Sequence, residues 1–241
     1  MSLNADFYSA QAQSFSATRQ RIQPGMIRSV GEWMVAHGGF QASASLHLLD
    51  LGCGNGNLAH WLAEQGFKGT YTGIEQSSGL ISTITDLPGN FKFHPSDLAH
   101  PDWLADLPTI PFDLITCFAV LHHLPGEGLR VRVLREVKRL LAPDGVFLFS
   151  VWQFMNSARL VKRIQPWERI GLVAGDVDEG DALLDWRAEG ESAGVAMRYV
   201  HAFGEEELHR LAGKSSFQIR DSWLSDGKEG CLGLYQSWSR S

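Results

Sequence analysis

The chain has 241 residues, of which 44% are hydrophobic and 20% charged, so it can bury a full core and is not a disordered tail. Its formal net charge of −6 argues against a general nucleic-acid coat, and we expect no DNA partner. Its three cysteines have no metal-ligand spacing, so we expect no metal site and a reducing, cytoplasmic compartment. No run approaches the roughly 20 apolar residues of a membrane span and no signal peptide is evident, so we expect no membrane partner.

Short apolar runs alternate with longer amphipathic ones as far as Trp152. The amphipathic runs at 58–66 and 127–145 predict helices. Apolar runs separated by helices predict a parallel sheet with helices on both faces, which right-handed crossovers wind into a doubly wound α/β fold. The predicted strands are 46–51, 70–75, 91–97, 112–124 and 146–152.

The pattern breaks after Trp152 and resumes near the end of the chain. A helix is predicted at 204–216, followed by strands at 217–224 and 231–239. The turn between these strands is too short for a parallel crossover, so the last strand must be antiparallel. We therefore predict a single domain over residues 1–241, with a seven-stranded, mostly parallel sheet and a last antiparallel strand.

Two segments lie outside this alternating core. They are residues 1–30, with an N-terminal helix, and an insertion at 153–200, in which Pro166 favours the start of a short helix. We expect both to form a cap over the carboxyl edge of the sheet, where it would exclude water and gate entry of a substrate.

The stretch LLDLGCGNGNLAHWL (48–62) places a glycine-rich turn between a strand and a helix, an arrangement typical of nucleotide sites. An NAD fingerprint would need a third glycine where Asn57 stands, and the Asp50 carboxylate would repel a pyrophosphate. The same carboxylate suits the ammonium of S-adenosylmethionine (SAM), whose own carboxylate can face the helix N-terminus. The turn therefore favours SAM as the cofactor.

The motif D-x-G-x-G-x-G after a first strand resembles that of class I SAM-dependent methyltransferases, and the resemblance covers 46–152 and 204–239. It implies that Glu75 accepts hydrogen bonds from the ribose hydroxyls and that Asp97 faces the adenine amino group. Taken singly, Glu75 could be a solvated strand-end residue and Asp97 a helix cap. The full set of implied cofactor residues is Asp50, Gly52, Cys53, Gly54, Asn57, Glu75, Gln76, Asp97, Leu98, Cys117 and Phe118.

Three further segments are similar to the methyltransferases that esterify carboxymethyl-uridine at the tRNA wobble position. They are FSATRQRIQP (15–24), the stretch 119–153 and RYVHAF (198–203). The resemblance implies a carboxylate acceptor in tRNA and allows for a small activating partner subunit. Residues 165–187 have no counterpart in this family, so the acceptor is open between tRNA and a small molecule.

An ionised carboxylate acceptor needs no general base, but it needs cations and hydrogen-bond donors to hold it. The resemblance implies Arg19, Tyr199 and His201 for this role, and Arg198 is also a suitable residue type. An O–H or N–H acceptor would instead need a base, for which His122 or His123 is the candidate. A small-molecule O- or N-methyltransferase and a catalytically silent SAM-fold module are the alternative functions.

Two basic clusters are permissive for RNA but do not require it, since solvated helix faces of this kind are common. The acidic stretch 176–181 offsets the second cluster. The first comprises Arg130, Arg132, Arg135, Lys138 and Arg139, and the second Arg159, Lys162, Arg163 and Arg169.

Overall fold

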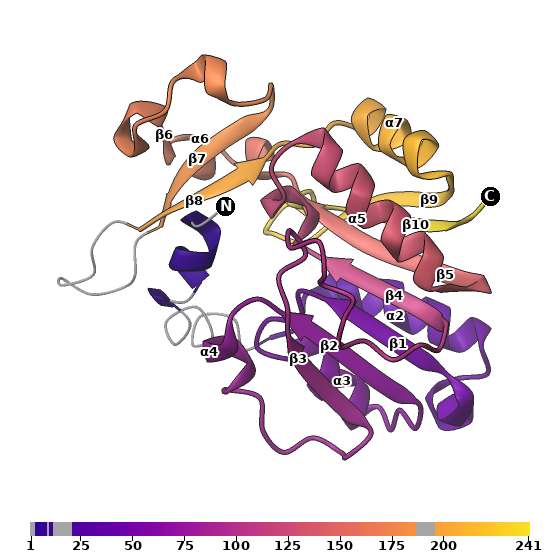
Figure 1. Cartoon of the computed structure of the whole chain (residues 1–241). Helices are drawn as coiled ribbons and strands as arrows, with labels where there is room; N and C mark the ends of the chain where they lie inside the picture. Colours follow the sequence, from indigo (N-terminus) through magenta and orange to yellow (C-terminus); the bar gives the residue numbers. More distant parts are fainter. Residues whose placement is uncertain (1–2, 9, 12–20, 187–195) are drawn as a thin grey trace.

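A large twisted sheet forms the centre of the molecule, and a smaller sheet lies beyond one end of its strands (Figure 1). The computed structural model describes residues 3–8, 10–11, 21–186 and 196–241. Arg19, an expected acceptor residue, lies outside these residues. The large sheet has the order β3-β2-β1-β4-β5-β10-β9. Its strands are β1 (His47–Leu51), β2 (Thr70–Glu75), β3 (Phe91–Pro95), β4 (Phe112–Phe118), β5 (Leu141–Trp152), β9 (Phe217–Ser225) and β10 (Gly233–Arg240).

The strand pairing is that of a doubly wound sheet. β1 pairs in parallel with β2 on one side and with β4 on the other. β2 also pairs in parallel with β3, and β4 with β5. β10 is antiparallel to both of its neighbours, β5 and β9. The predicted seven-stranded, mostly parallel sheet with a last antiparallel strand is confirmed. That strand lies between β5 and β9, one position in from the edge.

Helices cover both faces of the large sheet because its strands are apolar on both sides. Leu48 and Leu114 pack on one face and Leu49 and Ile115 on the other, as the alternation of side chains along a strand requires. A short helix, α4 (Ser78–Ile81), follows β2. The first face is covered by α2 (Pro24–Ala36) and α3 (Asn57–Glu64), and the second by α5 (Glu127–Leu140) and α7 (Glu205–Ser215).

Two element boundaries differ from the sequence prediction. The predicted strand 112–124 ends at Phe118 because Ala119 adopts a left-handed conformation, with φ 57°, and a 3₁₀ turn (Leu121–His123) follows. Helix α5 ends at Leu140, before Pro143, and β5 begins immediately at Leu141. The two histidines therefore lie on a turn beyond the strand, and this turn gives their rings different surroundings.

The expected N-terminal cap region, residues 1–30, includes residues that belong to the core. Helix α2 begins at Pro24, and its residues Val30, Trp33 and Met34 are buried against the sheet. Only the segment before α2 can form part of a cap. Helix α2 packs on the sheet because a position over the sheet edge would leave its apolar stripe exposed to solvent.

The insertion at 153–200 contains more regular structure than its pattern indicated. It forms the small sheet, an antiparallel β6-β7-β8 arrangement, and a 3₁₀ turn (Trp167–Ile170) follows directly after Pro166. Phe154, Leu160 and Val200 give it an apolar core of its own. None of the helices in the described part of the chain is long and apolar enough to cross a membrane. The elements are α6 (Ala158–Val161), β6 (Ile164–Gln165), β7 (Asp181–Trp186) and β8 (Ala196–His201).

Candidate active site

A cavity of about 1060 Å³ lies at the carboxyl ends of the parallel strands, between the large sheet and the small sheet. Its lining comes from the turns after β1, β2, β3, β4 and β5, from residues 3–8 and from the insertion. This is the edge at which open α/β sheets bind ligands. Its volume is at the upper end of the range for ligand pockets, so a nucleoside cofactor and a small second substrate can fit together.

The glycine turn after β1 forms one wall of the cavity. Gly52, Gly54 and Gly56 have φ values of 70°, 57° and 76°, in the left-handed region that favours glycine. A Cβ atom added to Gly52 would lie 2.4 Å from Cγ2 of Val120. At Gly54, which lines the cavity, no described residue other than its chain neighbours places an atom within 4 Å of the corresponding position. A ligand can therefore approach the backbone of the turn at Gly54.

Asp50 lies on β1 just before this turn, and only 3% of its surface is exposed. Its carboxylate accepts hydrogen bonds from the Tyr71 hydroxyl at 2.6 Å and the Thr116 hydroxyl at 2.7 Å. Burial raises the pKa of Asp50 to about 6, although these hydrogen bonds oppose the rise. Asp50 is thus a buried carboxyl that a cationic ligand group would favour in its ionised form.

Two further acids stand at the ends of the next strands, since Glu75 is the last residue of β2 and Asp97 follows β3. Glu75 accepts the Gly54 N–H at 3.1 Å and the Ser77 N–H at 2.9 Å, so it holds the glycine turn against the end of β2. Burial raises the pKa of Glu75 above its ordinary value. Asp97 accepts the Ala99 N–H at 2.8 Å and also lines the cavity.

Ten of the eleven expected cofactor residues line the cavity, and Cys117 does not. Cys117 is 1% exposed and packs into the core on the α5 and α7 face, whereas its neighbour Phe118 faces the opposite side and lines the cavity. Side-chain alternation along β4 therefore excludes Cys117 from direct contact. The ten are Asp50, Gly52, Cys53, Gly54, Asn57, Glu75, Gln76, Asp97, Leu98 and Phe118.

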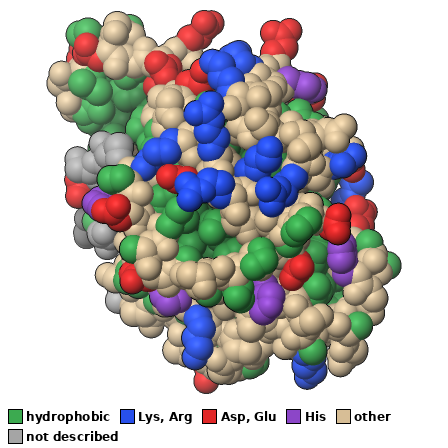
Figure 2. Space-filling view, turned by 45° about the vertical axis from the view of Figure 1, so that its right-hand side comes forward, with side chains coloured by type: hydrophobic (Ala, Val, Ile, Leu, Met, Phe, Trp, Pro, Cys, Tyr) green, Lys and Arg blue, Asp and Glu red, His purple; other side chains and the backbone are tan. Residues whose placement is uncertain are grey.

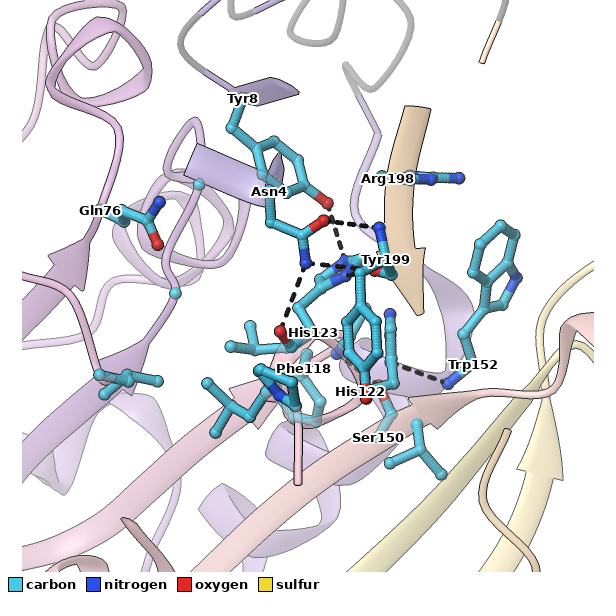
Figure 3. Close-up of a pocket in the computed structure, with 18 of the residues that line it drawn as sticks. Asn4, Tyr8, Gln76, Phe118, His122, His123, Ser150, Trp152, Arg198 and Tyr199 are labelled. Atoms are coloured by element: carbon cyan, nitrogen blue, oxygen red, sulfur yellow. Dashed lines mark hydrogen bonds between the residues drawn. The ribbon is translucent and has the colours of Figure 1, made fainter. Parts of the chain in front are cut away.

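The two histidines after β4 both line the cavity (Figure 3). Nδ1 of His122 accepts the backbone N–H of Trp152 at 3.1 Å. His123 lies 3.0 Å through Nδ1 from the carbonyl oxygen of Tyr199 and 2.8 Å through Nε2 from the Tyr8 hydroxyl. A carbonyl only accepts, so Nδ1 of His123 donates, and Nε2 of the neutral ring accepts from Tyr8.

Tyr199 lies on β8 where three segments meet. The Asn4 amide donates to the carbonyl oxygens of His123 at 3.3 Å and Tyr199 at 3.1 Å, and it accepts the Tyr199 N–H at 2.8 Å. Figure 3 shows these bonds joining the N-terminal segment, the histidine turn and β8. The expected acceptor residue Tyr199 therefore does line the cavity, held by its backbone.

His201 is placed elsewhere. It is 2% exposed, does not line the cavity, and lies between the carboxylates of Asp181 and Glu207. His201 therefore does not reach the cavity. It shares one face of β8 with Tyr199, two residues earlier, and at His201 this face points into the protein interior.

Arg198, on the opposite face of β8 from Tyr199, is a buried cation on the cavity wall with 5% of its surface exposed. Its guanidinium carbon lies 4.7 Å from the ring centre of Trp152 and 5.6 Å from that of Phe7. Figure 3 shows Arg198 and Trp152 on the same side of β8. Among the described residues, its Nε has no hydrogen-bond partner and no carboxylate pairs with it.

The comparison with known proteins agrees with this geometry. A family model described as a methyltransferase domain matches residues 25–222. The chain belongs to the methyltransferase domain family. A protein of Encephalitozoon cuniculi, named ECU09_1500 and described as a methyltransferase, is 30% identical over 217 residues, which cover 89% of this chain and 87% of that protein. The trans-aconitate 2-methyltransferase of Acidovorax sp. strain JS42 is 37% identical over 105 residues, which span 43% of this chain and only 37% of that enzyme.

Solved structures share the fold over the whole chain. The magnesium protoporphyrin IX methyltransferase of Synechocystis PCC 6803, with bound S-adenosylhomocysteine (SAH), has a TM-score of 0.66 and 17% identity, and the match covers 100% of this chain and 99% of that one. As a member of the methyltransferase domain family, the protein is a SAM-dependent methyltransferase, and SAM is its cofactor. The open backbone at Gly54 and the buried Asp50 carboxyl fit this cofactor.

The sequence interpretation placed Arg130 in a basic cluster on α5, but the structure places it in the interior. Figure 2 shows many Lys and Arg side chains on one face of the molecule. On α5 and α7, the exposed cations include Arg135, Arg139 and Lys214. Arg130 does not belong to this surface cluster, because only 1% of it is exposed. Its spacing from Leu134 and Val137 already put it on the apolar stripe of α5, which was the available sign of a buried partner.

Proposed function

We propose that this methyltransferase transfers the methyl group of SAM to a carboxylate of a small acid, and that Arg198 holds that acid. The observation that carries the proposal is the buried guanidinium of Arg198 on the cavity wall, which has no carboxylate partner among the described residues. A buried charge without a counter-charge is costly, and a bound carboxylate would supply one. Arginine binds carboxylates through two parallel hydrogen bonds.

The surroundings of Arg198 favour a substrate with an apolar body. Trp152 supports the guanidinium from one side through a cation–π contact. The insertion adds apolar side chains to the cavity lining, namely Trp167, Ile170, Leu172 and Val177. An acid with an apolar part would satisfy both features, with its charged group at Arg198.

The histidine geometry supports an acceptor that arrives ionised. The ring lone pairs of His122 and His123 are engaged by Trp152 and Tyr8. SAM supplies a methyl group on a positively charged sulfur. A carboxylate oxygen forms the new bond to the methyl carbon, and the carbon–sulfur bond breaks with its electron pair moving to sulfur. No proton moves in this step, so the protein contributes alignment and exclusion of water.

The small sheet and residues 3–8 would serve as the cap of this single catalytic domain. Asn4 and Tyr8 hold the N-terminal segment to the histidine turn and to β8, across the same end of the cavity. A cap in this position would enclose the acceptor and SAM together. A small acid can enter such a space more readily than a large nucleic acid, and the Acidovorax relative named for trans-aconitate, a carboxylic acid, supports this choice.

The test is a labelling experiment with purified protein and methyl-labelled SAM. The acceptor pools are carboxylic acids including trans-aconitate, neutral phenols, amines, and total tRNA, the acceptor that the sequence resemblance implies. Methyl esters release labelled methanol in mild alkali, whereas methyl ethers and methylamines do not. We expect alkali-labile label in the acid pool. Alkali-stable label among phenols or amines would contradict the carboxylate, and alkali-labile label in tRNA would contradict the small acceptor.

A further inference from the structure

Five polar side chains from four elements form a buried cluster behind the acceptor end of the cavity. They are Arg130 on α5, Asp181 on β7, Tyr199 and His201 on β8, and Glu207 on α7. The cluster joins the small sheet to two helices of the core.

Hydrogen bonds and ion pairs join the side chains of the cluster. Arg130 donates from Nη2 to the Tyr199 hydroxyl at 2.9 Å, and that hydroxyl donates to Oδ1 of Asp181 at 2.6 Å. His201 lies 2.6 Å through Nδ1 from Oδ1 of Asp181 and 2.9 Å through Nε2 from Oε2 of Glu207. Nη1 of Arg130 lies 3.3 Å from Oε1 of Glu207. Strands β7 and β8 of the small sheet are therefore linked through this cluster to helices α5 and α7 of the core.

The arrangement requires a charged imidazole. Ionised carboxylates only accept hydrogen bonds, so both ring nitrogens of His201 must donate. The imidazolium and Arg130 then balance the charges of Asp181 and Glu207. Burial opposes a charge on His201, but the hydrogen bonds to the two carboxylates outweigh it and raise the pKa of His201. The uncharged Phe203 ring and Gly180 also lie beside the imidazole.

Arg130 also connects the cluster to the cavity itself. Its Nε donates to the carbonyl oxygen of Leu124 at 2.9 Å, just after the histidine turn. Leu124, Asp181 and Tyr199 all line the cavity, whereas Arg130 and His201 do not. The two cations therefore act on the acceptor space only through the residues that they hold.

We infer that Arg130 and His201 are positioning residues, which fix strand β8, and with it Tyr199 and Arg198, as one wall of the acceptor site. This inference rests on the proposed function, which places the acceptor beside β8. When His201 loses its proton, one of its two carboxylate bonds is lost, and the half-buried residues Asp181 and Glu207 then present two carboxylates to one arginine. The raised pKa of His201 means that the bonds are complete at low pH and are lost as the pH rises through that folded-state pKa. Acceptor binding weakens in that direction, and SAM binding does not.

Hydrogen exchange and nuclear magnetic resonance on the full chain with bound SAH test this without any acceptor. The imidazole titration of His201 gives its pKa, and the amides of β7 and β8 report how firmly the wall is held. We expect their protection to fall at least tenfold as the imidazole loses its proton, while β1 and β4 amides keep theirs. His201→Gln should show the low value at every pH, and Glu207→Gln should move the transition to lower pH. His209→Gln, an exposed histidine on α7 bonded to its own helix, is the matched control.

Equal protection of β7 and β8 in His201→Gln and wild type, or a transition that does not follow the imidazole, would overturn the inference. With the acid that takes the label in the experiment above, His201→Gln should raise KM about tenfold and change kcat far less. A loss confined to kcat would also overturn it. Failure to find an acidic acceptor would refute the proposed function and leave the exchange result to stand by itself.

Discussion

The Nδ1 atom of His122 accepts a hydrogen bond from the backbone N–H of Trp152, which begins the connection from β5 to the insertion. A neutral imidazole that accepts at Nδ1 carries its hydrogen on Nε2, so it must break this bond to take up a proton there. The neighbouring His123 donates to the Tyr199 carbonyl and accepts from Tyr8. Both rings thus connect the turn after β4 to β5, to β8 and to the N-terminal segment. Under the proposed function, this gives them a role in alignment and not in proton transfer.

Replacing either histidine should therefore leave most of the chemical step intact. A general base contributes about 10²–10⁴-fold to a rate. We expect His122→Ala and His123→Ala each to reduce the single-turnover rate by less than about tenfold, through looser packing alone. The wild-type rate should show no rising limb near a pKa of ~6.5, the ordinary value for histidine. A rising limb that disappears in one of the two variants would instead indicate a base-catalysed O- or N-methyltransferase.

The Asp50 carboxyl should make SAM binding depend on pH. Its pKa of about 6, raised by burial, means that it gains a proton as the pH falls through that value and then no longer attracts the SAM ammonium. We expect SAM affinity, measured by calorimetry, to weaken below about pH 6. Asp50→Asn should cost roughly 1.5–3 kcal/mol, or about tenfold or more in affinity, and should remove the pH dependence. In the absence of SAM, the same raised pKa means that protonation of Asp50 favours the folded state as the pH falls from about 6 toward 3.8.

The exposed Asp144 at the start of β5 offers a matched control for this measurement. Asp144→Asn should bind SAM like the wild type at every pH. Glu75→Gln, which keeps the shape of the side chain but weakens its two backbone hydrogen bonds, should also weaken SAM binding. Wild-type affinity in both Asp50→Asn and Glu75→Gln would show that the cofactor does not bind at these strand ends.

The meeting of the glycine turn and the strand-end acids at one cavity was predictable from the sequence because it depends on local rules. Parallel strands end at one edge of their sheet, so the acids at the carboxyl ends of β1, β2 and β3 must come together there. Gly52 and Gly54 marked the turn for the same local reason, since their left-handed conformations favour glycine. Cys117 and Phe118 are neighbours on β4 and face opposite sides of the sheet, so only one of the two side chains could line the cavity, and the sequence did not show which.

The acceptor half depends on contacts between distant parts of the chain, and the sequence does not encode these in any short pattern. His201 was expected at the acceptor because its motif resembles that of a known family, but its partners Asp181 and Glu207 lie on two other elements. The small sheet was missed because β7 is buried on both faces and has no alternating pattern to distinguish it. Arg198 was a suitable residue type in the sequence, and only burial and the lack of a described carboxylate partner single it out.

A pair of glycine substitutions separates the tight turn at the cofactor from ordinary helix backbone. Gly52→Ala would put a Cβ atom 2.4 Å from Val120 and force a left-handed alanine, so we expect a loss of about 2 kcal/mol or more in the free energy of unfolding. Gly213 lies inside α7, and apart from its chain neighbours and the backbone of the helix itself, no described residue comes within 4 Å of an added Cβ. Gly213→Ala should stabilise the fold by roughly 0.5–1 kcal/mol. Urea midpoints with unchanged slopes measure both effects; a Gly52→Ala protein as stable as the wild type would show that the turn tolerates side chains.

Arg198 should determine which acceptor the enzyme uses. Loss of a charge-assisted hydrogen bond costs roughly 1.5–3 kcal/mol, so Arg198→Gln should lower kcat/KM for the acid by at least about tenfold. Arg198→Lys should recover little, because lysine keeps the charge but lacks the planar guanidinium that pairs with both carboxylate oxygens and stacks on Trp152.

Affinity for SAH should stay at the wild-type value in both variants, since Arg198 comes from β8 and the cofactor residues come from the large sheet. Arg220→Gln, an exposed arginine on β9 bonded to Ser239, is the control and should leave kcat/KM unchanged. If Arg198→Gln and Arg220→Gln were equally active toward the acid, another cation would have to hold its carboxylate, and Arg19, which the sequence resemblance implies, would be the next residue to replace.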